Sequence, residues 1–292
     1  MDTMKTTSVL AREADGTLQI TITIPKSDVA RVEQEVVDEL AKTTEVPGFR
    51  PGHAPVEEVK KRISAQEMLE KILGKLLPAA YQATLVEHKL QPVLSPKFEL
   101  VSVKQNEDWQ IRAITCEVPE VTLGEYQKEI DTAKRSNALW VPGKDPSTQL
   151  GAGKKEPSQA EKEQLVLDTL IKTTSVTIPA PLLEEEVNHR LSSFVDQTQK
   201  LGMTVEQYLT STGKTAQTLR DEFTKAAQEE LKAMLILSRI AENEEIKVED
   251  QEIEKTLQGN SDKKIELTPT QKQMIGGAIR RRKALDKLTA TI

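Results

Sequence analysis

The sequence predicts an α+β amino-terminal domain, a small antiparallel sheet with helices, joined to an all-α carboxy-terminal domain with arm-like helices. Three observations support this prediction. Residues 19–24 alternate strictly between polar and apolar side chains, which is typical of a half-buried strand. Glycine and proline gather in a polar stretch over residues 131–157, where no periodic pattern is found. From Ser158 onward, apolar residues recur at helical spacing.

The amino-terminal strands and helices follow from local patterns. Two more strands are predicted over 98–104 and 109–118, and Ser27 suits the N-cap of a helix that carries valines at helical spacing. A second, longer helix begins at a capping box that opens with Ser64. We expect Pro78 to kink or break this helix, because proline has no backbone N–H to donate. These elements form the predicted sheet with helices on one face.

The carboxy-terminal region consists of capped helices. A capping box begins at Ser158, and Gly202 is placed to end one helix as its C′ residue. A long helix is predicted over 215–243, and Pro269 suits the first position of the last helix. We therefore expect three parts along the chain: an amino-terminal domain over 1–130, a linker over 131–157 and a helical domain over 158–292.

Composition excludes several classes of protein. The 292 residues carry a formal net charge of −6, so a basic surface that coats nucleic acid is ruled out and any such contact must be local. One cysteine excludes a disulfide scaffold. The sequence contains no run of about 18 apolar residues that would suggest a membrane span, and its first residues contain no apolar signal segment. We expect a cytoplasmic protein without membrane contact.

No arrangement of residues suggests an enzyme, a cofactor or a metal site. His53, His88 and His189 lie far apart and in no metal-binding spacing, and Cys116 falls within a strand pattern, where a buried thiol is usual. The glycine-rich phosphate-binding and nucleophile motifs are absent. Acidic runs such as Glu184–Glu186 are typical of solvated helix faces. We expect no catalytic residue, no cofactor and no metal.

A loop over residues 46–55 is the most unusual feature of the sequence. It holds Phe49 and Arg50 between prolines and glycines, although an exposed phenylalanine contributes nothing to folding. An aromatic ring beside a guanidinium makes a good anchor pair for a pocket and an anion. The rigid flanks lower the ordering cost of binding. A plain tight connection is the alternative, but the residue types favour a docking loop. Its candidate contact residues are Gly48, Phe49, Arg50, Pro51, Gly52 and His53.

This loop resembles the ribosome-docking signature of the trigger factor family, Gly-Phe-Arg-x-Gly-Lys-x-Pro, the bacterial chaperones of the ribosomal exit tunnel. Residues 116–121 are similar to the end of the family's amino-terminal domain. Residues 176–187, 202–209 and 237–248 are similar, in order and spacing, to its helical carboxy-terminal domain. The resemblance covers nearly all of the chain except about 131–157.

Two departures from the family's pattern stand out. His53 takes the place of the usual lysine and is mostly neutral at pH 7, so that Arg50 carries more of the electrostatic attraction. Trigger factors normally carry an FK506-binding-type peptidyl-prolyl isomerase domain between their two halves, and such a domain needs about 90–100 residues. Only residues 131–157 occupy this place, so the resemblance implies a short form without the isomerase domain.

The resemblance implies a molecular chaperone that needs no ATP, docks at the exit tunnel of the large ribosomal subunit through ribosomal protein and rRNA, and shields nascent polypeptides. Two alternatives stay open. The first is a cytosolic holdase or assembly chaperone that has lost ribosome binding, which the histidine at position 53 would favour. The second is a peptidyl-prolyl isomerase, for which the sequence offers no module. The sequence also leaves open whether the free protein forms a homodimer.

The surface that binds unfolded clients is expected in the helical domain. Glycines at 202 and 213 break long helices into arms, and methionine suits promiscuous binding. Arg280–Lys283 are interpreted as a solvated helix face rather than a second RNA contact. The alternative for each client-site residue is a place in the core between helices. The candidate client-binding residues are Phe194, Met203, Tyr208, Leu209 and Met234.

Overall fold

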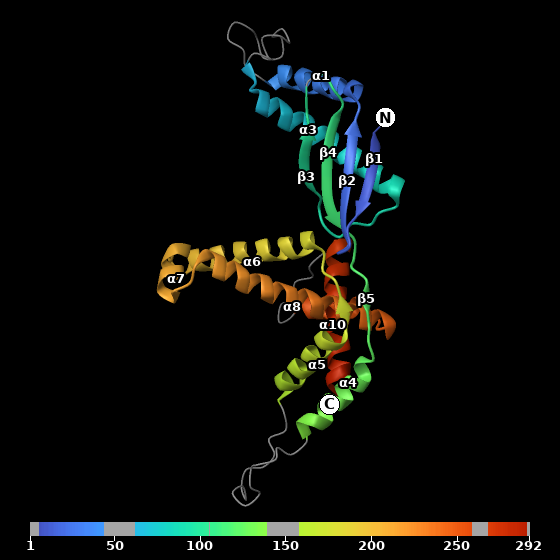
Figure 1. Cartoon of the computed structure of the whole chain (residues 1–292), viewed down its shortest axis with the longest axis vertical. Coiled ribbons are helices and arrows are strands. Elements are labelled where there is room, and N and C mark those ends of the chain that lie inside the picture. Colours follow the sequence, from blue (N-terminus) through green and yellow to red (C-terminus); the bar gives the residue numbers. More distant parts are fainter. Residues whose placement is uncertain (1–5, 44–61, 105, 139–157, 259–267, 291–292) are drawn as a thin grey trace, which may run out of the picture. The chain divides into compact units, whose positions relative to one another are not determined.

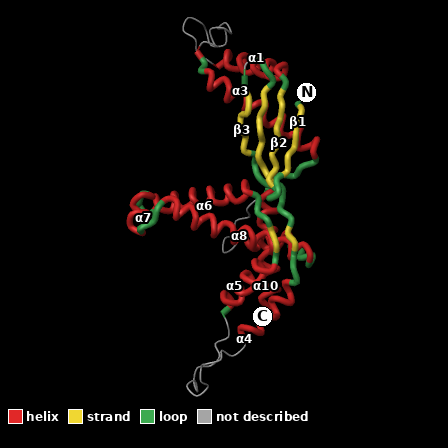
Figure 2. Tube along the Cα trace, in the orientation of Figure 1, coloured by secondary structure: helices red, strands yellow, loops and turns green. Residues whose placement is uncertain are grey.

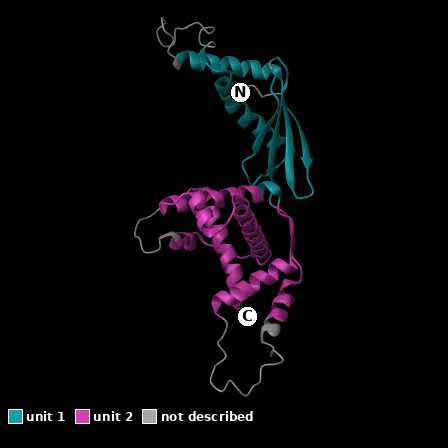
Figure 3. Ribbon diagram, turned by 60° about the vertical axis from the view of Figure 1, so that its left-hand side comes forward, with its two compact units in different colours: residues 1–118, 179–182 teal, residues 119–178, 183–292 magenta. Residues whose placement is uncertain are grey.

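A computed structural model describes residues 6–43, 62–104, 106–138, 158–258 and 268–290. The chain divides into two compact units, shown in Figure 3. Unit 1 consists of residues 1–118 and 179–182, and unit 2 of residues 119–178 and 183–292. Figure 1 labels the elements of both units. The predicted fold class, an α+β amino-terminal part followed by a helical carboxy-terminal part, is confirmed.

Unit 1 is built on a four-stranded antiparallel sheet in the order β1-β2-β4-β3 (Figure 2). Its strands are β1 (Thr7–Arg12), β2 (Thr17–Ile24), β3 (Lys97–Ser102) and β4 (Trp109–Cys116). The alternation of residues 19–24 belongs to the inner strand β2, where the apolar side chains are buried and Gln19, Thr21 and Thr23 are half-buried. The sequence does not predict the edge strand β1. Along most of this strand, exposed side chains alternate with side chains that are only partly buried.

Two helices, α1 (Lys26–Thr43) and α3 (Ala65–His88), supply the rest of the core of unit 1. Ser64 caps α3 as expected, by accepting a hydrogen bond from the backbone N–H of Glu67. Ser27 lies inside α1 rather than at its N-cap. The buried side chains that β2, β4, α1 and α3 contribute are Leu18, Ile20, Ile22, Ile24, Val29, Val32, Val36, Leu40, Ile72, Leu76, Ala80, Trp109, Ile111 and Ala113.

Helix α3 continues through Pro78, so the break that the sequence suggested does not occur. Pro78 itself is exposed, whereas Leu76 and Ala80 on either side of it are fully buried. Packing on both sides of the proline therefore holds the helix together, although one backbone hydrogen bond is lost. A proline on the solvent face of a well-packed helix is tolerated where a proline in an isolated helix would end it.

Unit 2 begins earlier than the sequence suggests. Residues 119–130, assigned to the amino-terminal domain, belong to unit 2, where Tyr126 and Ile130 are buried in its core. The linker prediction is also corrected at its start, because α4 (Tyr126–Ala138) continues past residue 131. Residues 139–157 lie outside the described residues. A short ladder of β5 (Val121–Thr122) and β6 (Ser175–Val176) adds strand structure to a domain predicted to be all helical.

The remaining elements of unit 2 are helices. They are α5 (Gln159–Thr173), α6 (Ala180–Lys200), α7 (Val205–Thr212), α8 (Ala216–Asn243), α9 (Asp250–Gln258) and α10 (Pro269–Ala290). Helices α4, α5, α8 and α10 pack around one core. The capping box at Ser158, the long helix near 215–243 and Pro269 at a first helical position are all as predicted. The buried core residues are Tyr126, Ile130, Val166, Leu170, Ile236, Leu237, Ile240, Ala241, Ala284, Leu285 and Leu288.

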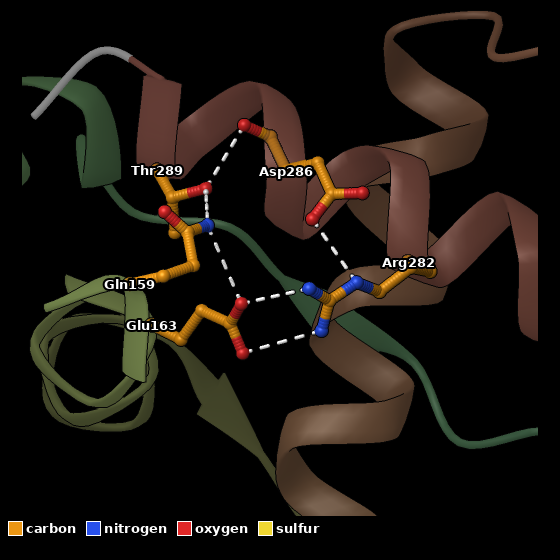
Figure 4. A network of polar contacts seen from close by, with 5 residues as sticks. All are labelled: Gln159, Glu163, Arg282, Asp286 and Thr289. Carbon is orange, nitrogen blue, oxygen red and sulfur yellow. Dashed lines mark hydrogen bonds and ion pairs between the residues drawn. The ribbon is translucent and has the colours of Figure 1, made fainter. Parts of the chain in front are cut away.

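A polar network joins α5 to α10 beside this core (Figure 4). Both terminal guanidinium nitrogens of Arg282 donate to the carboxylate of Glu163, at 2.7 and 3.2 Å. The Nε atom of Arg282 lies 3.0 Å from Asp286, and the Gln159 amide donates to the Thr289 hydroxyl. The hydrogen bond from Arg282 lowers the pKa of Glu163. Arg282, one residue of the basic run on α10, is thus already paired with carboxylates of the protein itself.

Gly124, between β5 and α4, is a position where only glycine fits. A β-carbon there would lie 2.5 Å from the carbonyl oxygen of Thr173, a backbone atom that cannot move aside alone. We expect Gly124→Ala to lower the free energy of unfolding of unit 2 by about 1–3 kcal/mol, the usual range for overpacking. Gly74→Ala in α3 is the matched control, because a β-carbon there meets nothing within 4 Å.

The control variant should gain up to about 1 kcal/mol in unit 1, since alanine favours helix over glycine. Urea unfolding curves with hydrogen-exchange mass spectrometry, which assigns the change to one unit, measure both effects. Equal stability changes in the two variants would show that the contact with Thr173 does not constrain the backbone.

Candidate functional site

The predicted docking loop lies outside the described residues. Its candidate residues Gly48, Phe49, Arg50, Pro51, Gly52 and His53 all fall within 44–61, the segment that connects α1 to α3. The described chain ends at Thr43 on one side and resumes at Arg62 on the other. Both flanking helices are anchored in the core of unit 1 by buried side chains.

The candidate client surface lies on an arm formed by α6, α7 and α8 of unit 2. Helix α8 runs antiparallel to α6, because Arg190 contacts Glu230 while Phe194, further along α6, contacts the earlier residue Phe223 (Figure 1). Two left-handed glycines turn the chain at the end of the arm. Gly202 follows α6 with φ +72°, and Gly213 follows α7 with φ +66°. Gly202 therefore takes the helix-ending role that the sequence predicted.

Three aromatic rings meet where α6, α7 and α8 come together. The ring of Phe194 contacts Tyr208 with a centroid distance of 4.8 Å and Phe223 with one of 5.7 Å, both in edge-to-face geometry. Edge-to-face pairs are favourable because the positive ring edge meets the negative ring face. All three residues are half-buried, so their rings pack on one another and still present apolar surface to solvent. We call Phe194, Tyr208 and Phe223 the aromatic cluster.

Ion pairs hold the helices of the arm together next to the aromatic cluster. Arg190 of α6 contacts Glu186 one turn earlier, at 2.8 Å, and also reaches Glu230 of α8. Lys214, between α7 and α8, lies 2.6 Å from Glu222 of α8. Ion pairs on the surface contribute little on their own. The arm also has buried apolar side chains, Val187 on α6 and Leu219, Ala227 and Leu231 on α8.

The structure brings together some of the predicted client-binding residues and separates another. Phe194 and Tyr208 are in ring contact, and Met203 and Leu209 are half-buried in the turn after α6 and in α7. Met234 is half-buried on α8, about 16 Å further along the helix axis than Phe223 at 1.5 Å per residue. Phe223, which lies within the predicted helix 215–243, is not among the residues that the sequence predicts to bind clients. Its ring contact with Phe194 depends on tertiary packing, which no local pattern reveals.

The possible reactive groups in the described residues do not form a catalytic arrangement. Burial, and secondarily the negative charge of Asp15, raises the pKa of the Cys116 thiol to about 11, so this thiol is protonated at neutral pH. His88 shares a 2.8 Å contact with the Ser8 hydroxyl. Glu186 pairs with Arg190. No group of three metal-ligating side chains occurs among the described residues. Across the same part of the chain, no helix is long and apolar enough to cross a bilayer.

Two protein-family models match the chain. The model described as "Bacterial trigger factor protein (TF)" matches residues 6–138, and the model described as "Bacterial trigger factor protein (TF) C-terminus" matches residues 144–290. Only residues 139–143 lie between the two matches. The interior of the chain therefore has no unmatched segment of domain length.

Curated relatives support the same family. A trigger factor of Streptococcus agalactiae serotype III is 33% identical over 128 residues, which are 43% of this chain and 30% of that protein. A trigger factor of Streptococcus uberis is 35% identical over 118 residues, 39% of this chain and 28% of that protein. The aligned part of this chain thus spans less than a third of these relatives.

A solved structure has the same fold. It is described as "Promiscuous Substrate Recognition in Folding and Assembly Activities of the Trigger Factor Chaperone" and is similar with a TM-score of 0.66 at 15% identity. The similarity covers 97% of this chain and 99% of the other. At this identity it shows the fold alone. Because the two family models together match residues 6–138 and 144–290, the chain belongs to the trigger factor family.

Proposed function

We propose that this protein is an ATP-independent molecular chaperone that docks at the exit tunnel of the large ribosomal subunit and shields nascent polypeptides. One observation carries the proposal: the docking signature, residues 48–55, lies within the region that matches the amino-terminal trigger factor model. The partners implied are ribosomal protein and rRNA at the tunnel exit, together with unfolded nascent chains. This activity belongs in the cytoplasm, where translation takes place.

Phe49 and Arg50 are the proposed anchors of docking. A phenylalanine ring can fill an apolar pocket of a ribosomal protein, and a guanidinium can bind a phosphate or carboxylate with two hydrogen bonds. Pro51 restricts the free loop and so reduces the entropy lost on binding, whereas Gly48 and Gly52 permit backbone conformations that other residues disfavour. His53 contributes little charge at pH 7, so contacts to RNA by this loop depend chiefly on Arg50.

The aromatic cluster and its neighbours Met203 and Leu209 are the proposed client-binding surface. The half-buried rings are held in place by their mutual contacts and still offer apolar area. Binding a client therefore costs the conformational entropy of the client but little of that of the rings. Methionine adapts to clients of different shape. Met234 is a separate contact further along α8. Many weak apolar contacts suit a chaperone that must release what it binds.

No isomerase activity is proposed for this chain. The trigger factor matches leave five residues between them, residues 139–143, whereas a compact domain needs about 50 residues or more. Shielding by apolar contact also needs no nucleotide, and no cofactor or metal is proposed. A prolyl isomerisation assay on a short peptide tests this part of the proposal, which catalysis by the purified chain would refute.

One alternative has an observation in its favour. A histidine at position 53, where the family signature has lysine, weakens the positive charge of the docking loop. A chaperone that acts away from the ribosome would tolerate this loss. The two proposed functions differ in whether the protein binds the ribosome, but both place client binding on the arm. Separate experiments on the docking loop and on the arm therefore distinguish them.

Photo-crosslinking tests the proposed client surface. A photoreactive phenylalanine analogue is placed at position 203, 208 or 209 and irradiated with an unfolded, apolar-rich client. We expect crosslinks from these positions and few from exposed Glu229 on α8 of the same arm, the matched control. Crosslinks from unit 1 positions with none from these three would show that the client surface lies elsewhere.

A further inference from the structure

A pocket of about 480 Å³ lies between α9 and α10, away from the aromatic cluster. Its walls come from the segment that follows α8, from the start of α9 and from the first three turns of α10. Its volume falls within the range of small-ligand pockets. The residues that line it are Ile246, Lys247, Val248, Asp250, Ile253, Lys272, Gln273, Gly276 and Arg280.

The floor of this pocket is aliphatic and is shaped by a glycine pair in the middle of α10. Ile253 of α9 is buried, and its Cδ1 atom lies 3.4 Å from where a β-carbon of Gly276 would stand. Gly277 follows directly. Each glycine inside a helix costs about 1 kcal/mol relative to alanine. Here Gly276 lets α9 approach closely and leaves Ile246, Val248 and Ile253 to form an apolar surface.

The rim of the pocket carries an excess of positive charge. The pocket is lined by three cations, Lys247, Lys272 and Arg280, and by one carboxylate, that of Asp250. Within the described part of the chain, none of these three cations takes part in an ion pair. The Nε atom of Arg280 instead lies 3.4 Å from the carbonyl oxygen of Gly276, which leaves both terminal nitrogens of its guanidinium without a carboxylate.

The neighbouring cations of α10 behave differently. Arg282 binds Glu163 and Asp286, and Lys283 lies 2.6 Å from Glu252 of α9. Arg281 is half-buried with one guanidinium nitrogen 3.4 Å from the β-carbon position of Gly277. Its burial, and then the charge of Arg280, lowers the pKa of Arg281. Among the described residues, Lys272 and Arg280 are thus the cations of α10 that line the pocket and take no part in an ion pair.

We infer that this pocket binds acidic, aliphatic segments of unfolded polypeptide, with carboxylates bound by Lys272 and by Arg280 and an aliphatic side chain on the floor of Ile246, Val248 and Ile253. The inference rests on the proposed chaperone function, which supplies such segments, and it names a client chemistry different from that of the aromatic cluster. Arginine and lysine bind carboxylates by charge-assisted hydrogen bonds. The apolar floor adds affinity that a bare ion pair on the surface lacks.

A peptide carboxylate fits this pocket better than RNA does. None of the described residues that line the pocket is aromatic, so these residues offer unpaired bases no stacking platform. Asp250 and the adjacent Glu249 would repel a continuous phosphate backbone, whereas a peptide can place one carboxylate away from them. The aliphatic floor offers no hydrogen-bond donor or positive charge to a phosphate group. The three features together favour an acidic peptide with aliphatic side chains.

Fluorescence anisotropy with a defined probe tests the inference. The probe is a fluorescein-labelled ten-residue peptide of leucine, isoleucine and serine that carries two glutamates, and in its amide counterpart glutamine replaces both glutamates. We expect Lys272→Gln/Arg280→Gln to weaken binding of the acidic peptide about three- to thirtyfold, as two surface ion pairs would. Lys172→Gln/Lys225→Gln removes the same charge from exposed sites outside the pocket and should bind like the unaltered chain.

Three results would overturn the inference: equal binding by both double variants, equal binding of the acidic and amide peptides, or full displacement of the peptide by oligouridylate. Suppression of aggregation of a neutral, apolar client is measured in parallel. If the unaltered chain suppresses aggregation but does not bind the acidic peptide, the pocket assignment fails and the proposed function stands. Loss of both activities refutes the proposed function as well. Circular dichroism verifies that each variant is folded.

Discussion

Ribosome affinity is expected to fall about 30- to 700-fold in the Phe49→Ala/Arg50→Ala variant. Each anchor that is truncated in an interface typically costs about 1–3 kcal/mol, and neighbouring anchors add less than fully, which gives about 2–4 kcal/mol for the pair. Binding should also weaken as salt rises, because contacts with RNA phosphates release counterions. Co-sedimentation with 70S ribosomes at several salt concentrations measures both effects.

Two further variants make this prediction specific. Arg31→Ala removes an exposed arginine of α1 whose ion pairs among the described residues are with Asp28 and Glu35 of its own helix, and it should leave ribosome affinity unchanged. His53→Lys restores the positive charge of the family signature and should tighten binding slightly. Unchanged affinity in the Phe49/Arg50 variant would rule out docking through this loop. A clear loss in His53→Lys would show that the histidine makes a contact of its own.

The stability of unit 2 is expected to fall by about 2–5 kcal/mol in the Ile236→Ala variant. Ile236 is fully buried where α8 packs in the core with α5 and α10. Its truncation removes apolar contacts and leaves a cavity that the helices cannot fill without moving. Denaturant unfolding followed by hydrogen exchange of the α8 and α10 peptides measures the loss in unit 2 alone.

Ile236→Val is the control for this effect, because it removes a single methylene group and should cost only about 0.5–1.5 kcal/mol. Phe223→Ala, on the half-buried part of the same helix, should cost less stability than Ile236→Ala and reduce client crosslinking more. The opposite ranking would mean that the aromatic cluster is a structural core and not a binding surface.

Much of the fold could be predicted because its signals are local. The alternation of β2, the capping residues Ser158 and Ser64, and the turn glycine Gly202 each depend on neighbours within a few positions. The edge strand β1 escapes prediction, since a strand with one free edge and Val9 69% exposed lacks a clear burial pattern. Helix α9 has nine residues, and Ile253 is the one buried apolar side chain among its residues 250–256, too few for a periodic signal.

The domain boundary and the arm could not be predicted in the same way. Tyr126 and Ile130 belong to unit 2 because they pack with Val166 and Leu170, which lie about 40 residues further along the chain. The aromatic cluster likewise joins three helices through side-chain contacts, so its composition follows from tertiary structure. The role of residues 48–55 came from the family resemblance, whereas the residue types alone indicated only a docking loop.

The central claim, a chaperone that shields nascent chains while it is docked on the ribosome, is tested most directly by crosslinking on translating ribosomes. A photoreactive residue at position 208 is irradiated with stalled ribosomes that carry an apolar nascent chain. We predict a crosslink to the nascent chain that is largely lost when Phe49→Ala/Arg50→Ala is introduced. A crosslink that persists undiminished in that variant would contradict the claim and support a chaperone that acts without ribosome docking.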